Sequence, residues 1–223
     1  MRRTLALCAA VMTALGLVGV AYAAATHFRD VKPVRYDPSK TRLVDAEWLD
    51  GIGCPTAAKL SDGSTYTDSA CTTGDPPDKA NMGLLLAKTG PTPNNAAAFA
   101  ILRKVKGGTI TELGYDIRRG SHCGAGAPRF NVTTQDGTTY FIGCNSPAGA
   151  ATVGQGWTRL RWGGSTPLLA YGPSGTLVDI SHMTVTEVDI AFDEGQDTGP
   201  DNSGLAVLDN IDVNGTLVGQ GDN

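Results

Sequence analysis

Short runs in which apolar and polar residues alternate make up most of this chain, and Gly, Pro, Asn and Asp separate one run from the next. In residues 129–134, Phe130 and Val132 hold one phase of the alternation, while polar residues hold the other. A period of two is that of a β-strand with one buried face. The pattern therefore predicts an all-β protein, with residues 94–105 as a competing helix candidate.

About nine or ten short strands are expected, and such a number in one domain suggests a two-sheet antiparallel β-sandwich of the jelly-roll kind. The dipeptide Asp136-Gly137 predicts a tight hairpin turn inside residues 129–142. The other runs with strand character are residues 44–48, 83–88, 97–105, 110–119, 157–162, 183–192 and 205–213.

The first 23 residues have the layout of a secretory signal peptide. Arg2 and Arg3 precede a long apolar run, which closes on the small-residue pattern Ala21-Tyr22-Ala23. Cleavage is therefore expected after Ala23, and the protein is expected to be secreted by a bacterium. An uncleaved membrane anchor is the alternative, because the apolar run is nearly long enough to span a bilayer.

The rest of the chain divides into two parts. Residues 24–42 are charged, contain Pro and show weak periodicity, which predicts an arm or linker. Residues 43–223 are expected to form the single β-sandwich domain, and no later apolar stretch approaches the length of a membrane span. The formal net charge of the whole chain is −4 and no basic block occurs, which argues against nucleic acid as a partner.

Four cysteines follow the predicted signal peptide: Cys54, Cys71, Cys123 and Cys144. An even number of cysteines in an exported chain implies disulfides, so the sandwich is expected to be disulfide-stapled. Of the three possible pairings, the sequential one (54–71 and 123–144) closes the shortest loops and is favoured. A zinc site is the competing idea, but the chain has no CxxC motif and only three histidines.

Asp209 is the most informative polar residue of the last strong strand candidate. It falls in the same alternating phase as the apolar residues Leu205, Val207, Ile211 and Val213. A carboxylate that faces inward from a strand needs a hydrogen-bonded partner or a cation. The alternative is a β-bulge at Asp209-Asn210, which would turn the carboxylate outward.

The closing stretch FDEGQDTGPDNSGLAVLDNIDVNG, residues 192–215, resembles the last two strands of secreted jelly-roll domains of the carbohydrate-binding-module and lectin type. Those domains often end in a strand with the pattern LDN(I/V)xV, and in several families its aspartate binds a structural calcium. The resemblance implies a calcium site at Asp209, with Asp45 and Glu47 near the N-terminal strand as positional candidates. The loop residues Asp193, Glu194, Asp197 and Asp201 are further oxygen ligands, although such loops are usually only solvated.

Arginines recur at polar strand positions, and aromatic residues accompany them. A sheet face with aromatic platforms and planar guanidinium donors suits sugar rings, including uronic or sulfated ones. The alternative is that the aromatic residues fill the core and the arginines face water. The candidate ligand-binding residues are Tyr115, Arg118, His122, Arg129, Trp157, Arg159 and Arg161.

The sequence contains few signatures of catalysis. Neither G-x-S-x-G nor H-E-x-x-H occurs, and no acid/base pair of carboxylates stands out. His122 with Arg129 leaves polysaccharide lyase chemistry open, since such lyases use a histidine or tyrosine base beside an arginine. The favoured hypothesis is a secreted, non-catalytic β-sandwich that binds extracellular polysaccharide or cell-surface glycan. A structural or adhesion protein of the cell envelope is second, and a lyase or glycosidase third.

Overall fold

The computed structural model describes residues 28–75, 81–92, 94–124, 126–147, 150–194 and 204–220. The predicted signal peptide, residues 1–23, lies outside them. These described residues form sixteen strands and no helix. Accordingly, they contain no helix of a length and apolarity that would cross a lipid bilayer.

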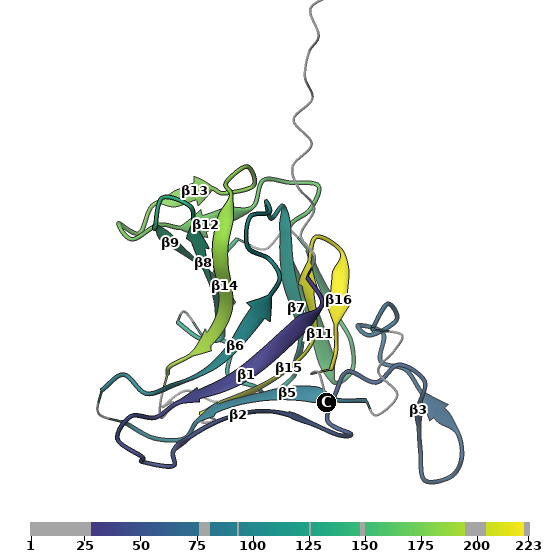
Figure 1. The fold of residues 1–223 in the computed structure, drawn as a ribbon. Helices are drawn as coiled ribbons and strands as arrows, with labels where there is room; N and C mark the ends of the chain where they lie inside the picture. Colours follow the sequence, from purple (N-terminus) through teal and green to yellow (C-terminus); the bar gives the residue numbers. More distant parts are fainter. Residues whose placement is uncertain are drawn as a thin grey trace, which may run out of the picture.

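Two large sheets, in which every neighbouring pair of strands is antiparallel, form a sandwich (Figure 1). Sheet A has the order β1 (Asp30–Tyr36), β6 (Ala97–Arg103), β14 (Val185–Phe192), β8 (Arg129–Thr134), β9 (Thr139–Gly143), β12 (Leu169–Tyr171) and β13 (Leu177–Asp179). Sheet B has the order β10 (Ala150–Val153), β11 (Trp157–Gly163), β7 (Glu112–Arg118), β15 (Leu205–Val213), β5 (Gly83–Lys88) and β2 (Val44–Leu49), and β16 (Thr216–Val218) pairs with β15. The disulfide-stapled two-sheet jelly-roll sandwich predicted from the sequence is thus confirmed.

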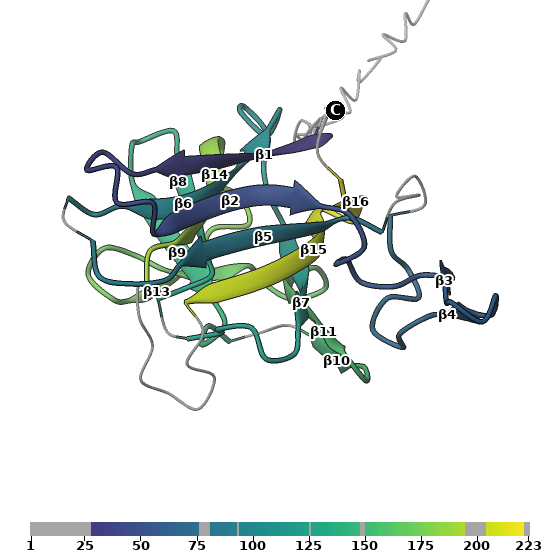
Figure 2. The same ribbon diagram turned by 90° about the horizontal axis from the view of Figure 1, so that it is seen from below.

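A small hairpin of β3 (Ala58–Lys59) and β4 (Thr65–Tyr66) projects from the sandwich beside sheet B (Figures 1 and 2). It belongs to the long connection between β2 and β5. The Cys54–Cys71 disulfide closes this connection on itself, and Cys123–Cys144 joins the two ends of the β8–β9 hairpin. Both pairs are those favoured from the sequence, and the predicted pairing is confirmed.

The core lies between the inner faces of the two sheets. Its centre is a cluster of three aromatic rings from strands β7, β8 and β11: Tyr115, Phe130 and Trp162, with ring centroids 5.2 to 6.0 Å apart. Edge-to-face and offset contacts of this kind add to the free energy gained by burying the rings. The alternation read from the sequence is confirmed here, since Phe130 and Val132 are fully buried while Arg129 and Asn131 are only partly covered.

One local expectation was wrong, and the choice between helix and strand at residues 94–105 falls to the expected strand. Residues 30–36, placed in an arm over 24–42, form strand β1, which pairs with β6 along its whole length. Pro33 is tolerated there because β1 is an edge strand, where one side of the backbone needs no ladder partner. The competing helix candidate over 94–105 is strand β6, whose inward residues Ala98, Ala100 and Leu102 are buried.

Candidate functional site

Side chains that pair directly across sheet A form one continuous row on its outer face. From β1 to β12, each row member alternates along its strand with a fully buried residue, as Asp189 does with Ile190 and Phe141 does with Ile142. The row therefore points away from the core. From edge to edge it contains Lys32, Ile101, Asp189, Asn131, Phe141, Tyr171 and Leu177, one from each of the seven strands.

Asp189 and Asn131 are the polar centre of this row. The Asn131 amide donates from Nδ2 to Asp189 Oδ1 over 2.9 Å, and its own Oδ1 accepts from Arg129 Nε at 3.1 Å. Burial and, to a smaller extent, the nearby charge of Glu187 raise the pKa of Asp189 to about 6, against the lowering effects of Asn131 and Arg129. The sheet face therefore holds a carboxyl group that has lost much of its hydration.

Arg129 lies two residues before Asn131 on β8. Its side chain is bound by Asp193, the residue that follows β14. Its Nη1 and Nη2 atoms donate to the two carboxylate oxygens of Asp193, each over 2.7 Å, which is the bidentate geometry of a strong ion pair. Its guanidinium carbon also lies 5.8 Å from the ring centroid of Phe141. The hydrogen bonds to Asp193 raise the pKa of Arg129.

Two hollows flank the polar centre on this face. One has a volume of about 250 Å³, and its lining is Val34, Tyr36, Phe99, Ile101, Glu187 and Asp189. The other has a volume of about 200 Å³, and its lining is Arg129, Phe141, Gly143, Asn145, Ser146 and Tyr171. In Figure 1, strands β14 and β8 lie between the strands that carry most of these two linings. The arrangement offers aromatic and aliphatic surface on both sides of a hydrogen-bonding pair.

The sequence-predicted residues are not brought together, and Arg129 is the member that lies on this face. Tyr115 has no exposed surface, and its hydroxyl donates to the Pro128 carbonyl over 3.1 Å inside the sandwich. Trp157 is buried in a small cluster with Cys54 and Cys71. Tyr115 therefore fills the sandwich core, as the alternative interpretation of the sequence had it, whereas Trp157 fills a separate buried cluster.

His122 is close to Arg129 through a shared loop, although it is buried. Adjacent acids at the end of β14 hold the two residues, since Glu194 contacts His122 Nε2 while Asp193 binds Arg129. The imidazole also lies edge-on to Phe192, with ring centroids 5.7 Å apart. Together with the Cys123–Cys144 disulfide, these contacts fix the loop before β8, so they give His122 a structural role. Asp197 and Asp201 lie outside the described residues.

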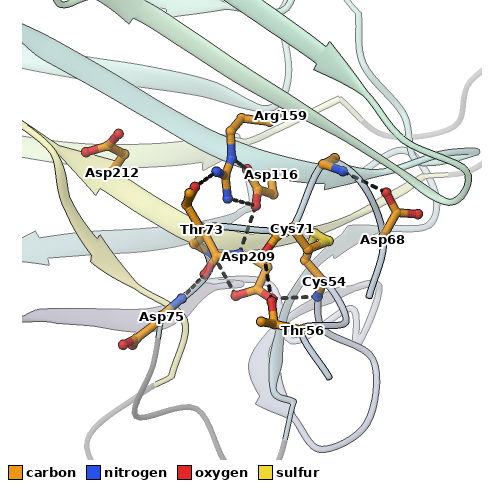
Figure 3. A network of polar contacts seen from close by, with 12 residues as sticks. Cys54, Thr56, Asp68, Cys71, Thr73, Asp75, Asp116, Arg159, Asp209 and Asp212 are labelled. Atoms are coloured by element: carbon orange, nitrogen blue, oxygen red, sulfur yellow. Dashed lines mark hydrogen bonds and ion pairs between the residues drawn. A yellow bond between two sulfur atoms is a disulfide. The ribbon is translucent and has the colours of Figure 1, made fainter. Parts of the chain in front are cut away.

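The remaining predicted arginines lie on sheet B. Arg159 binds both oxygens of Asp116 over 2.8 Å (Figure 3). Arg161 pairs with Asp212 at 2.8 Å. Arg118 is exposed on β7. Asp116 and Asp212 are almost wholly buried, so the two arginines neutralise interior acids and are committed to the fold. Burial raises the pKa of Asp212 to about 7 despite the attraction of Arg161.

Asp209 faces the outer side of sheet B, and its expected inward phase was wrong. The register of β15 against β7 shifts between Asp209 and Asp212, and Asn210 has a positive φ of 46°. This β-bulge lets both Leu208 and Ile211 face the core. The bulge alternative thus describes β15, yet Asp209 is only 1% exposed because the segment before β5 covers it. Its carboxylate accepts from the backbone amides of Cys54 and Asn210, each over 2.6 Å.

The predicted calcium ligands are not assembled. Asp45 and Glu47 form ion pairs with Arg35 at 2.6 and 3.2 Å, and strand β5 separates their strand β2 from β15. Ligand atoms of Cys54, Cys71 and Asp116 lie within 4.8 Å of one another, but both sulfurs belong to the disulfide. Calcium binding at Asp209 stays a prediction.

Sequence reasoning missed four central members of the face: Asp189, Asn131, Phe141 and Tyr171. The signal for two of them was present. Asn131 was placed in the outward phase of its strand, and Phe141 alternates with the buried residues Tyr140 and Ile142 across the same hairpin. An outward-facing aromatic residue next to outward-facing polar residues is the sequence pattern that would have predicted this face.

Comparison with known proteins adds one structural similarity. No family model matches the chain, and no curated protein matches it. Among solved structures, the family 11 carbohydrate-binding module of the cellulosomal cellulase Lic26A-Cel5E of Clostridium thermocellum is similar, with a TM-score of 0.42 and 12% sequence identity. The match covers 90% of this chain and 99% of that chain. The function proposed below therefore rests on this chain's own residues.

Proposed function

We propose that this protein is a glycan-binding β-sandwich and that the outer face of sheet A is its binding face. The observation that carries the proposal is the unbroken row from Ile101 to Tyr171, in which aromatic and aliphatic side chains flank the hydrogen-bonded pair Asp189–Asn131. A sugar ring has an apolar face and an edge of hydroxyl groups. Aromatic rings suit the first, and carboxylate and amide groups suit the second.

The spacing of the two hollows supports a chain of several sugars as the ligand. The aromatic walls of the hollows are centred on Phe99 of β6 and Phe141 of β9, which are three strand positions apart. At about 4.8 Å per strand this is roughly 14 Å, which is more than one sugar ring covers. An oligosaccharide lying across the strands would reach both hollows and place its middle unit over Asp189 and Asn131.

Export is part of the proposal. A signal peptide that is cleaved after Ala23 would deliver the domain to a compartment where two disulfides form, and extracellular polysaccharide or cell-surface glycan would be the material bound. N-terminal sequencing of the protein recovered from culture medium tests this step. The expected sequence starts at Ala24, whereas an intact Met1 in cell-associated protein would overturn cleavage and release.

Affinity electrophoresis tests the binding itself. Wild-type protein is run through native gels that contain soluble cellulose derivatives, xylan, mannan, galactan or dextran, beside the double variant Phe141→Ala/Tyr171→Ala. At least one polysaccharide is expected to retard the wild type but not the variant. Val153→Ala is the matched control, since Val153 is 68% exposed on edge strand β10 of sheet B. Equal mobility of wild type and variant in every gel would contradict the proposal.

A further inference from the structure

The acids on the binding face outnumber the cations that are available to a ligand. Asp189 and Glu187 project from β14 and both line the larger hollow. Lys32 lies on edge strand β1, at the far end of the row, and Arg103 of β6 is bound to Asp30 over 2.7 Å. An anionic sugar placed over the middle of the face would therefore meet carboxylates first.

Arg129, the cation nearest the centre, is already occupied. Four of the five N–H donors of a guanidinium are used here, two by Asp193, one by the Gly126 carbonyl and one by Asn131 Oδ1. The ion pair with Asp193 also neutralises the positive charge. A ligand carboxylate or sulfate could gain a bidentate grip on Arg129 only by displacing Asp193.

We infer that the face selects uncharged glycans and rejects uronic or sulfated ones, with Asp189 and the Arg129–Asp193 pair as the residues that set this specificity. The inference rests on the proposed glycan-binding function and names its ligand class. It departs from the expectation that guanidinium groups on this protein would recognise acidic sugars. The physical basis is that a like charge brought next to a partly desolvated carboxylate costs free energy that a hydroxyl group does not.

Matched polymers with one backbone and different charge give the direct test. The pairs are hydroxyethyl cellulose with carboxymethyl cellulose, dextran with dextran sulfate, pullulan with carboxymethyl pullulan, and methyl-esterified pectin with its de-esterified form. Dissociation constants come from affinity electrophoresis at low ionic strength. For every backbone that binds, the neutral polymer is expected to bind at least tenfold more tightly than its charged partner.

Two isosteric variants make the test specific to the named residues. Asp193→Asn frees the Arg129 charge and Asp189→Asn removes the central carboxylate, so each is expected to narrow the tenfold preference. Asp62→Asn, in the remote β3–β4 hairpin, is the control that should leave the preference unchanged. The salt dependence of wild-type binding gives a second test that needs no variant. Raising the ionic strength from about 0.01 to about 1 M shortens the Debye length from about 30 to about 3 Å. The preference of the wild type is expected to shrink over that range.

The outcomes separate this inference from the function on which it rests. If a charged polymer binds wild type as well as its neutral partner, and Phe141→Ala/Tyr171→Ala abolishes that binding, the face binds glycans but the inferred selectivity is wrong. A preference that is unchanged in both Asp variants and by salt would equally overturn the role of these residues. If none of the eight polymers binds, the glycan-binding proposal fails for these backbones, and the inferred selectivity fails as well.

Discussion

The carboxylate of Asp189 accepts a hydrogen bond from the Asn131 amide on the neighbouring strand, 2.9 Å away, at the middle of the outer face of sheet A. The bond favours the ionised carboxylate, yet burial outweighs it and the pKa of Asp189 is raised to about 6. The groups that face Asp189 are Glu187 on its own strand and Arg129 with Asn131 on β8. Keeping an ionised acid at this place near neutral pH therefore lowers the stability of the fold. Such a cost is what we expect of a group that has a role in the proposed binding.

Asp189→Asn is expected to change the pH dependence of stability. Because the folded-state pKa of about 6 lies above the ordinary value of 3.8, the stability associated with Asp189 is fully present below about pH 4 and is lost as the pH rises through about 6. The variant should therefore exceed the wild type in free energy of unfolding at pH 8, by on the order of 2 kcal/mol. At pH 4 the two should agree.

Urea unfolding at the two pH values measures this difference. Asp62→Asn gives the control of opposite sign, because hydrogen bonds from Ser64 lower the pKa of Asp62. If wild type and Asp189→Asn differ in free energy of unfolding by the same amount at pH 4 and at pH 8, the pKa of Asp189 is not raised.

Arg159→Met is expected to destabilise the fold by about 3 kcal/mol, because it leaves the buried Asp116 without its bidentate partner. Arg118→Met is the matched control on the adjacent strand. Arg118 is exposed, and its replacement should shift the free energy of unfolding by no more than about 0.5 kcal/mol. Equal losses for the two variants in urea unfolding would contradict a structural role for the Arg159–Asp116 pair.

Removal of the Cys54–Cys71 disulfide by paired Ala substitutions is expected to cost about 3 kcal/mol, given a sequence separation of 17 residues. The same change at Cys123 and Cys144, 21 residues apart, should cost a similar amount. Amide hydrogen exchange distinguishes the two disulfide variants. The amide at position 54, which donates to Asp209, should lose protection in the first variant and keep it in the second.

Asp209→Asn is expected to lower the melting temperature by several degrees, because the carboxylate accepts two short backbone hydrogen bonds under the 50–75 segment. If these two hydrogen bonds alone account for the role of Asp209, the loss should be the same in calcium and in EDTA. Thermal melts in both buffers decide the matter. A wild type that EDTA destabilises, with a variant that EDTA does not affect, would establish the calcium predicted from the sequence.

The alternating pattern predicted the strands of the sandwich and the β8–β9 hairpin, and the shortest-loop argument predicted both disulfides, because each of these features depends on residues that are close in the sequence. Strand β1 was missed because Pro33 and the charges around it mask a short edge strand. The sequence could give the bulge at Asp209-Asn210 only as an alternative, since a positive φ at one residue leaves no trace in the alternation of apolar and polar residues.

The binding face depends on pairings between distant segments. Asp189 meets Asn131 and Ile101 because β14 lies between β8 and β6, and the sequence does not state that order. Aromatic residues such as Tyr115 and Trp157 could be assigned to the core or to a surface with equal physical sense until the sheets were placed. Their burial, and the partners of Arg159 and Arg161, come from the tertiary structure alone.

Backbone chemical-shift mapping by NMR tests the central claim most directly. The wild type is titrated with an oligosaccharide prepared from whichever neutral polysaccharide retards it most strongly in the gels. The account predicts that the largest shift changes fall on the row of sheet A, at Ile101, Asp189, Asn131, Phe141 and Tyr171. Shift changes that cluster instead on the outer face of sheet B, or a titration that leaves the row unmoved while the oligosaccharide binds, would contradict it.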